Sequence, residues 1–573
     1  MKNINFKLLA IVLISAGLFA SCGLNRMVNN YDEGVRFTPE TNPLENHGGQ
    51  VAAEVQGDIS EGYFHRKAVV ELTPVLKYEG TEKELETVVL RGSNTTTEGR
   101  MINRDQSTTI NLNNVISFEP EMLASELYIR ATVYREGREE RATQLPDRKV
   151  ADGVINTSQF IKNDHLVSIA PHGYEKEVIV SKAADIYFAY MRHNLNWRLD
   201  LNRAEEARAR ISELTEFIER GWELKAVEVD AWASPEGEIA FNMELSENRA
   251  ETGERYIRNL FSQKDIETPE LRVDAKGEDF DGFMTKLNAS DLPDKQIIAN
   301  VINSQIAPAE RERRIKDMTL IYAEIEKILE PLRRAEITVH AYEPKRSDEE
   351  IADLAISNPA ELDQDELLFA ATLTDNKQTQ LAIYRSATDL FPNSYEGFNN
   401  AAAILLEMKE VEQAASYLER ANQLAPGNGH VQNNLGIVAA WQYDDESAKS
   451  LFQSARAQGI NVSYNMGVLQ IRSGDYRDAL ASFSGYTCLY NVALAQLMVD
   501  NQSAAINTLN CAPECGQVAY LKAVIAARNN DATALYNNLR KAIEFNANLK
   551  NMAANDREFV QFFGQSEFQD IVR

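Results

Sequence analysis

Apolar and polar positions divide the chain into stretches of different periodicity. From about residue 50 to residue 180, apolar side chains fall on every second position, as at Leu127, Ile129 and Ala131, with polar or aromatic residues between them. Alternation of this kind predicts strands that bury one face. Turn sequences such as Arg-Glu-Gly-Arg separate the short runs. We therefore predict a β-sandwich over residues 50–180.

Strand-like and helix-like runs alternate over residues 181–345. Val227, Val229 and Ala231 repeat with period two, whereas the apolar residues between 204 and 218 recur every three or four positions. The first spacing predicts a strand, and the second predicts one face of an amphipathic helix. We predict an α/β domain with the order strand, helix, strand, helix, strand, and an insertion of two helices between residues 283 and 332.

The last third of the chain, residues 355–573, is helix-forming sequence with an internal repeat. Identical residues recur at a spacing of 34, as do Asn400 and Asn434, Pro392 and Pro426, and the alanines at 387, 421 and 455. This period and these small residues resemble the tetratricopeptide repeat, in which two antiparallel helices bury small residues at their crossing. We predict an all-α solenoid whose concave face binds a protein partner.

Residues on the first helix of each pair are expected to line that concave face. Asparagine side chains can bind an extended peptide backbone there, because each amide offers a donor and an acceptor. The alternative is that these side chains cap helices and fill the space between repeats. The residues concerned are Tyr395, Phe398, Asn399, Asn400, Gln432, Asn433 and Asn434.

The N-terminal residues are typical of a bacterial export signal. Two lysines precede an apolar run over residues 8–20, which is short for a membrane span and leads through small residues to Cys22. The sequence around Cys22 resembles a lipobox, which implies removal of residues 1–21 and attachment of lipid to this cysteine. Residues 22–49 are polar and show no periodicity, so we predict a lipid-anchored tether there.

Charge and cysteine content narrow the possible functions. The 573 residues carry a formal net charge of −27, which argues against binding to nucleic acid. Besides Cys22 there are only Cys488, Cys511 and Cys515, too few for a disulfide scaffold and wrongly spaced for a zinc site. One disulfide among these three cysteines is possible in an oxidising compartment.

One motif in the α/β region resembles the OmpA C-terminal domain, which associates with peptidoglycan. A strand containing Asp230 is followed by Ser-Pro-Glu-Gly, by Asn242 and by Leu-Ser-Glu-Asn-Arg-Ala at 245–250, at that family's spacing. Residues 332–337 are similar to the family's last strand, and Ser-Pro-Glu-Gly is similar to a variant in OmpA-like proteins of the Bacteroidota. The resemblance implies an OmpA-like fold for residues 181–345.

The same resemblance implies a ligand, the diaminopimelate of a peptidoglycan stem peptide. A guanidinium can hold the ligand carboxylate through two parallel hydrogen bonds. Ser234 stands where the family has the aspartate that holds the ligand ammonium, which leaves Glu236 or Asp230 to reach that group. The alternative is a retained fold whose groove no longer binds cell wall, with an internal salt bridge at the arginine. The residues implied are Arg249, Ser234, Asn242, Glu236 and Asp230.

These observations lead to a prediction of function without catalysis. The sequence contains no nucleophile elbow, no His-Glu-x-x-His and no phosphate-binding glycine loop, and it suggests no cofactor and no metal. Gly23 without a following acidic run is similar to outer-membrane lipoproteins that face the periplasm. The leading hypothesis is a scaffold that ties the outer membrane to peptidoglycan and binds a protein through its repeats, within a secretion or assembly machine.

Two other hypotheses remain open from the sequence. The first is a pure interaction or assembly factor for an outer-membrane complex, whose OmpA-like domain no longer binds peptidoglycan. The second is a surface lipoprotein that captures glycans, which protease shaving of intact cells would distinguish from a periplasmic protein.

Overall fold

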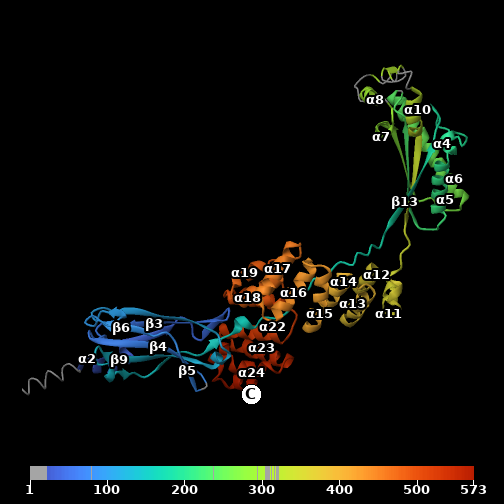
Figure 1. Ribbon diagram of the computed structural model, residues 1–573. Coiled ribbons are helices and arrows are strands. Elements are labelled where there is room, and N and C mark those ends of the chain that lie inside the picture. The colour runs from blue at the N-terminus through green and yellow to red at the C-terminus, as the bar shows by residue number, and fades with distance from the viewer. Residues whose placement is uncertain are drawn as a thin grey trace, which may run out of the picture. The chain divides into compact units, whose positions relative to one another are not determined.

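The computed structural model describes residues 22–573 with a few gaps, and it divides into two compact units (Figure 1). The first unit joins residues up to Pro171 with Asp375–Arg573, and the second unit is His172–Thr374. In the part of the chain that is described, no helix is both long enough and apolar enough to cross a membrane. The expected export signal, residues 1–21, lies outside the described residues. The gaps are residues 79, 237, 293, 294, 303–306, 308, 309, 311, 312, 315, 316 and 318–321.

Two β-sheets form the N-terminal part of the first unit. One sheet has the order β1-β3-β2-β12 with β8 paired to β3, and the other has the order β10-β9-β4-β6-β7 with β11 on β9 and β5 on β4. The strands of the first sheet are β1 (Val35–Pro39), β2 (Leu44–His47), β3 (Gln50–Ile59), β8 (Thr108–Ser117) and β12 (Val154–Ile155). Those of the second are β4 (Ala68–Tyr78), β5 (Thr81–Glu84), β6 (Val88–Gly92), β7 (Arg100–Ile102), β9 (Glu126–Arg135), β10 (Thr143–Gln144) and β11 (Arg148–Ala151).

The two sheets share one hydrophobic core, as the alternating sequence pattern predicts. In β9, Leu127, Ile129, Ala131 and Val133 are buried, while the residues between them are partly exposed. Side chains from both sheets belong to the same buried cluster. The two short 3-10 helices of this region are η1 (Pro120–Ala124) and η2 (Glu139–Arg141).

The predicted tether over residues 22–49 is wrong. Helices α2 (Cys22–Asn29) and α3 (Tyr31–Gly34) precede β1, and Met27, Tyr31 and Val35 are buried in the core of the β region. The Tyr63 hydroxyl donates a 3.0 Å hydrogen bond to the carbonyl of Met27. Met27 lies on α2, Tyr31 on α3 and Val35 at the start of β1, so each element is too short to show a period in the sequence.

The β region also ends earlier than residue 180. Its last strand, β12, stops at Ile155, and η3 (Thr157–Gln159) follows. The Thr157 hydroxyl donates to Glu558 at 2.6 Å, so the chain here already contacts the C-terminal helices. Residues 160–171, which we call the strap, contain no helix or strand and lie along the repeat helices.

Pairs of antiparallel helices with the predicted spacing form the C-terminal part of the first unit. Gly436 lies where a Cβ would come within 2.6 Å of the Phe452 ring, and Gly467 bears the same relation to Phe483 at 2.4 Å. These glycines are the small residues at the helix crossings. The helices are α13 (Lys377–Leu390), α14 (Tyr395–Glu407), α15 (Val411–Leu424), α16 (Gly429–Trp441), α17 (Asp445–Ala457), α18 (Ser463–Ser473), α19 (Tyr476–Ser482), α20 (Tyr490–Met498), α21 (Gln502–Cys511), α22 (Gly516–Arg528), α23 (Ala532–Phe545), α24 (Leu549–Asn555), η7 (Arg557–Phe562) and α25 (Ser566–Val572).

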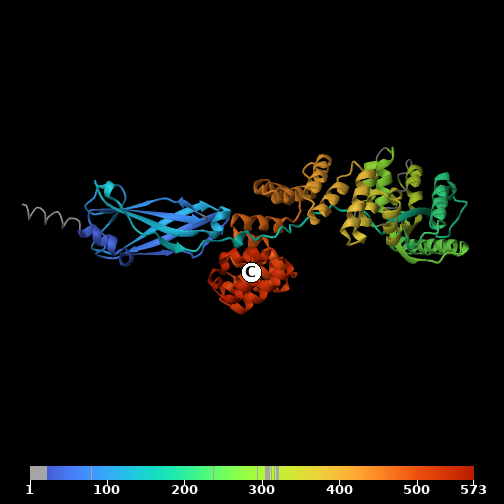
Figure 2. The same cartoon turned by 90° about the horizontal axis from the view of Figure 1, so that it is seen from below.

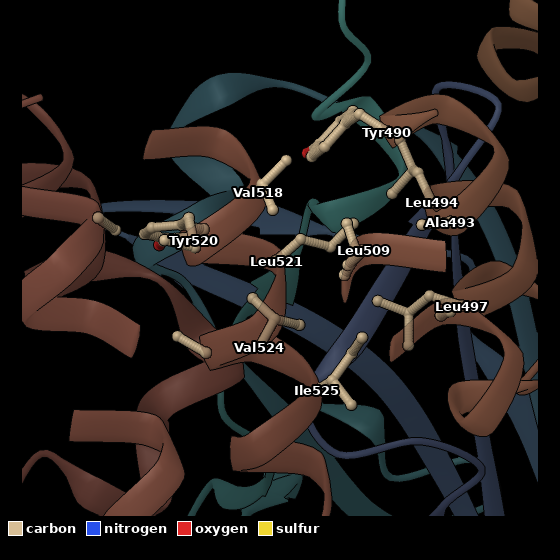
Figure 3. Close-up of a cluster of buried hydrophobic side chains, with 14 of the residues drawn as sticks. Tyr490, Ala493, Leu494, Leu497, Leu509, Val518, Tyr520, Leu521, Val524 and Ile525 are labelled. Carbon is tan, nitrogen blue, oxygen red and sulfur yellow. The ribbon is translucent and has the colours of Figure 1, made fainter. Parts of the chain in front are cut away.

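A continuous apolar core joins the later repeats. Side chains from α20, α21 and α22 converge in it, among them Leu494, Leu509 and Leu521 (Figure 3). The repeats begin at α13 rather than at residue 355, because the preceding helices belong to the second unit. Those helices are α11 (Asp348–Ser357), η5 (Pro359–Glu361), α12 (Gln364–Ala370) and η6 (Ala371–Leu373).

A mixed four-stranded sheet forms the centre of the second unit. Its order is β13 (Ile179–Tyr187), β16 (Arg334–Tyr342), β14 (Leu224–Ala233) and β15 (Glu270–Glu278). Helices α5 (Glu205–Ile218) and α6 (Ile239–Gln263) pack on one face, and α4 (Asp200–Arg203) precedes α5. At Gly253 of α6 a Cβ would come within 2.7 Å of Val229, so this glycine allows close approach of helix and sheet.

The predicted insertion between residues 283 and 332 is helical where it is described. Its helices are α7 (Phe280–Ala289), α8 (Lys295–Ile302), α10 (Tyr322–Leu329) and the 3-10 turn η4 (Glu330–Leu332). Phe283, Leu287, Ile298, Ile325 and Leu329 form a small core separate from that of the sheet. The charged stretch 309–315 falls mostly outside the described residues.

Candidate functional site

Arg249, the residue implied to hold a ligand carboxylate, is only 1% exposed on α6. Its Nε donates to the Arg192 carbonyl at 3.0 Å, and Nη1 donates to the Trp232 carbonyl at 2.8 Å. Nη2 makes a longer bond, 3.4 Å, to the Ala189 carbonyl. Burial, together with the charge of nearby Arg333, lowers the pKa of Arg249 to about 9. The guanidinium therefore binds backbone carbonyls of its own chain and makes no salt bridge with any described residue.

A buried ion pair fills the space beside Arg249. Nη2 of Arg333 donates to Oε1 of Glu236 at 2.5 Å, and both side chains are 3% exposed. The Ser234 hydroxyl donates to the same carboxylate at 2.8 Å. Oε2 of Glu236 is buried and has no hydrogen-bond partner among the described residues. The Glu236 carboxylate thus pairs with Arg333 and is near enough to Arg249 to influence its pKa.

Asn242 closes the same cluster from the start of α6. Its side chain is buried, and Nδ2 donates to Oε1 of Glu278 at 2.8 Å. Longer contacts of 3.4 and 3.5 Å join the same nitrogen to the carbonyls of Ser234 and Glu236. Four of the five residues implied by the sequence, Ser234, Glu236, Asn242 and Arg249, are therefore gathered in one buried cluster.

Asp230, the fifth residue, does not belong to this cluster. Its neighbours on β14, Val229 and Ala231, point into the core beneath the helices. Successive side chains of a strand point to opposite faces, so Asp230 faces the other side of the sheet. There its carboxylate lies 3.3 Å from Nζ of Lys276. The expectation that Asp230 helps to bind an ammonium group at this site is wrong.

Arg333 is the residue of this site that the sequence did not identify. The similarity of residues 332–337 to a family strand places Arg333 at the start of β16, but no local pattern shows which carboxylate it meets. Arg333 pairs at 2.7 Å with Glu326, seven residues earlier. Its buried partner Glu236 lies 97 residues earlier, in the loop after β14. Only the pairing of β14 with β16 brings the two together.

The concave face of the repeats holds a second candidate site, and it is already filled. The strap runs beside the repeat helices (Figure 2). Four asparagines on successive first helices bind it. Oδ1 of each accepts a backbone N–H and Nδ2 of each donates to the carbonyl of the same strap residue. Asn400 binds Ala170 (2.7 and 3.0 Å), Asn434 binds Ser168 (2.8 and 2.8 Å), Asn465 binds Leu166 (2.7 and 2.9 Å) and Asn491 binds Lys162 (2.9 and 2.8 Å).

Additional asparagines link these bonds into a network. Asn399 donates to the Ser168 carbonyl at 3.0 Å, and Asn433 donates to the Leu166 carbonyl at 3.1 Å. Each also accepts a hydrogen bond from the asparagine of the next repeat, at 3.0 Å from Asn434 and 2.9 Å from Asn465. The prediction that these asparagines bind an extended backbone is confirmed. The backbone belongs to the chain itself.

Two strap side chains add contacts that depend on sequence. The Tyr464 hydroxyl donates to the Asp164 carboxylate at 2.6 Å. His165 is 7% exposed, stacks on Phe452 and accepts a 2.9 Å hydrogen bond from the indole of Trp441. Burial lowers the pKa of His165 to about 3, and the nearby cations Arg472 and Lys409 contribute to this shift. The histidine is therefore neutral when the strap is bound.

The other predicted groove residues act within the repeats. The ring of Phe398 lies 6.1 Å from that of Tyr417, and Gln432 donates to Asn422 at 3.0 Å. For these two residues the alternative interpretation as packing residues agrees with the contacts, and Tyr395 is the partly buried first residue of α14. The sequence missed Asn465 and Asn491, because the later repeats are shorter than 34 residues and the spacing no longer identifies the equivalent positions.

The structure also decides the cysteine pairing. Cys488 and Cys511 form a disulfide with their Cα atoms 5.0 Å apart. Cys515 is a free thiol of intermediate exposure. The sequence had left all three pairings open. The side chain of Cys22, the expected lipid attachment site, lies outside the described residues.

No family model and no curated protein matches this chain. Among solved structures, a tetratricopeptide repeat protein from Parabacteroides merdae is similar at 14% identity and a TM-score of 0.29, covering 37% of this chain and 91% of that one. PilF of Pseudomonas aeruginosa (15%, TM-score 0.27, 39% and 98% covered) and the type IV pilus biogenesis factor PilW (15%, 0.27, 40% and 100%) are also similar. The C-terminal region resembles these proteins, and its assignment as helical repeats rests on the helix pairs described above.

Proposed function

We propose that this protein is a non-enzymatic scaffold of the bacterial envelope that binds a protein partner through its repeat region. The observation that supports this proposal most directly is the ladder of asparagines along the first helices. Such a ladder binds peptide backbone through neutral, paired hydrogen bonds and offers no group for chemistry on a substrate. A surface of this kind is used to hold polypeptide in an extended form.

The proposed location follows from the N-terminal sequence. Lipid on Cys22 would hold the chain to the outer membrane, facing the periplasm, where the disulfide between Cys488 and Cys511 is chemically compatible. Replacing Cys22 with serine and fractionating the cells tests the anchor. We expect the protein to move from the membrane fraction to the soluble periplasmic fraction, and retention in the membrane would contradict the anchor.

A second candidate function is a tether to peptidoglycan through the second unit, which we propose to be an OmpA-like domain. The gathering of Ser234, Asn242 and Arg249 in one cluster favours it, as does the mixed sheet with helices on one face. The Glu236 carboxylate already pairs with Arg333 in this buried cluster. A stem-peptide carboxylate would therefore have to replace Glu236 at Arg333 and approach Arg249.

Co-sedimentation with isolated sacculi tests the tether. Glu236→Gln removes the competing charge while keeping the size of the side chain, so a working tether should bind more tightly as this variant. Glu247→Gln, an exposed position on the same helix, is the matched control and should leave binding unchanged. Failure of both the native chain and Glu236→Gln to pellet would reject the tether and leave the scaffold function standing.

Chemical crosslinking in intact envelopes tests the scaffold. A stoichiometric partner that purifies with the full-length chain under native conditions is the expected result. Recovery of the chain alone, at every crosslinker length tried, would contradict the proposal.

A further inference from the structure

The strap leaves one of its two backbone edges unused. The asparagine ladder binds both the N–H and the C=O of Leu166, Ser168 and Ala170. In an extended chain these groups point to opposite sides at successive residues. The backbone groups of residues 165, 167 and 169 must therefore point away from the ladder.

The outward groups have no partners in the described part of the protein. No hydrogen bond reaches the backbone N–H or C=O of His165, Val167 or Ile169 there, although the side chain of His165 is bonded. The next outward carbonyl, that of Asn163, is taken by Nζ of Lys409. The unused edge is therefore bounded, and it runs over residues 165–169.

We infer that this outward edge is a docking site for an extended segment of a partner protein, which adds to the strap as a neighbouring strand. The inference rests on the proposed scaffold function and names where and how the partner binds. Three N–H and C=O pairs recur at every second residue, a spacing that only another extended backbone can match along its length.

The exposed side chains of the strap fit the same occupant. Leu166 is 43% exposed and Ile169 is 40% exposed, on opposite sides of the extended chain. A strand beside the strap would cover both of them with alternate side chains of its own. We therefore expect a partner segment rich in β-branched or aromatic residues, which pack well at such positions.

Displacement of the strap is the competing way to use the groove. The strap is covalently connected at both ends, so its effective concentration at the ladder is on the order of millimolar or higher, and a free peptide must exceed that. Asp164 and the buried His165 add contacts that a foreign peptide would have to reproduce. We therefore expect the partner to bind to the strap itself, while the asparagines stay bonded to the strap backbone.

Proline substitutions separate the two edges. Val167→Pro removes an outward N–H and leaves the three N–H groups bound by the ladder intact, and an extended chain tolerates proline. Val167→Ala is the matched control, because it shortens the side chain and keeps the N–H. Ser168→Pro removes an N–H that Asn434 binds and is expected to loosen the strap instead.

The probe is a displayed library of random dodecapeptides, selected on the full-length chain and followed by hydrogen exchange. We expect selected peptides that slow exchange at residues 165, 167 and 169 and leave residues 166, 168 and 170 protected. Loss of one hydrogen bond should weaken them roughly three- to tenfold in Val167→Pro and not in Val167→Ala.

Several results would overturn the inference. The first is that no selected peptide protects the outward amides, and the second is that the peptides bind the Val167→Pro chain as tightly as the native chain. The third is that the peptides expose residues 166–170 to exchange. The fourth is that the chain associates with itself through this edge. If an envelope partner purifies equally well with the native and the Val167→Pro chains, docking at the outward edge is rejected and the scaffold function is retained. Recovery of no partner at all would reject the scaffold function itself.

Discussion

The repeat groove and the Arg249 cluster are both occupied by the chain itself, but by different chemistry. The groove holds backbone through the neutral amides of four asparagines, whereas the cluster holds one carboxylate through the guanidinium of Arg333. Neutral amide pairs lose little solvation free energy on burial, and their number makes the bound state robust. A buried ion pair loses much more, so its net stabilisation is small and a competing anion can replace one member. The first site therefore depends on many neutral hydrogen bonds, and the second depends mainly on one buried ion pair.

The largest loss of stability is expected when the ion pair of the charged site is broken. Arg333→Ala leaves Glu236 buried without its cation, which should destabilise the second unit by about 3–5 kcal/mol. Urea denaturation followed by hydrogen exchange of amides in α6 and β16 measures it. The double variant with Glu236→Ala should recover much of the loss, and equal instability of single and double variants would show that the ion pair is not the cause.

Acidification should loosen the groove site. His165 has a pKa of about 3 in the folded chain and an ordinary pKa of 6.5 in the unfolded chain. Below pH 6.5 the unfolded chain therefore binds more protons at this residue than the folded chain does. Stability from the docked strap is therefore complete above about pH 6.5 and falls by about 1.4 kcal/mol per pH unit toward pH 3.

Hydrogen exchange at residues 166–170, corrected for the intrinsic rate, measures this loss between pH 7 and pH 5. Burial raises the pKa of the neighbouring Asp164, and this shift changes the stability with pH in the opposite direction. The His165→Gln variant is therefore needed to isolate the contribution of the histidine. Protection that declines equally in native and His165→Gln chains would contradict the assignment.

Removal of one asparagine of the ladder is expected to destabilise the docked strap, with a smaller effect than Arg333→Ala or acidification. Asn434→Ala leaves the N–H of Ser168 without its partner, at about 1–3 kcal/mol, while the Ser168 carbonyl keeps its hydrogen bond from Asn399. Faster exchange at Ser168 and faster proteolysis within the strap are the readouts. Asn551→Ala, at an exposed position on α24, is the control and should change neither.

The smallest loss of stability is expected when the Ser234 hydroxyl of the charged site is removed. Ser234→Ala removes a hydrogen bond to a carboxylate that keeps its bond to Arg333, so a loss of about 1 kcal/mol is expected in the same denaturation experiment. A loss as large as that of Arg333→Ala would mean that the serine, and not the arginine, holds Glu236 in place.

Much of the fold could be predicted because it depends on local periodicity. The alternation around Ile129, the helical spacing up to Ile218 and the 34-residue recurrence of Asn400 and Asn434 all record which face of an element is buried. The burial of Met27, Tyr31 and Val35 was missed because these residues belong to two very short helices and to the start of β1, within a polar segment.

The sites could be predicted only in part, because their decisive contacts join distant residues. The sequence identified Asn399, Asn400, Asn433 and Asn434 and the motif around Arg249, since both depend on the spacing of residues close together along the chain. It did not show that Lys162 meets Asn491, 329 residues later, or that Glu236 meets Arg333. No pattern within the strap itself distinguishes it from an ordinary connecting loop.

The course of the strap has a mechanical consequence. A chain that is anchored at its N-terminus and held elsewhere through the second unit would carry tension along residues 155–172. The component of that tension parallel to the strap crosses the asparagine bonds, so it loads the whole ladder in shear instead of peeling the bonds apart one after another. A connection laid along a row of amides is thus arranged to transmit force.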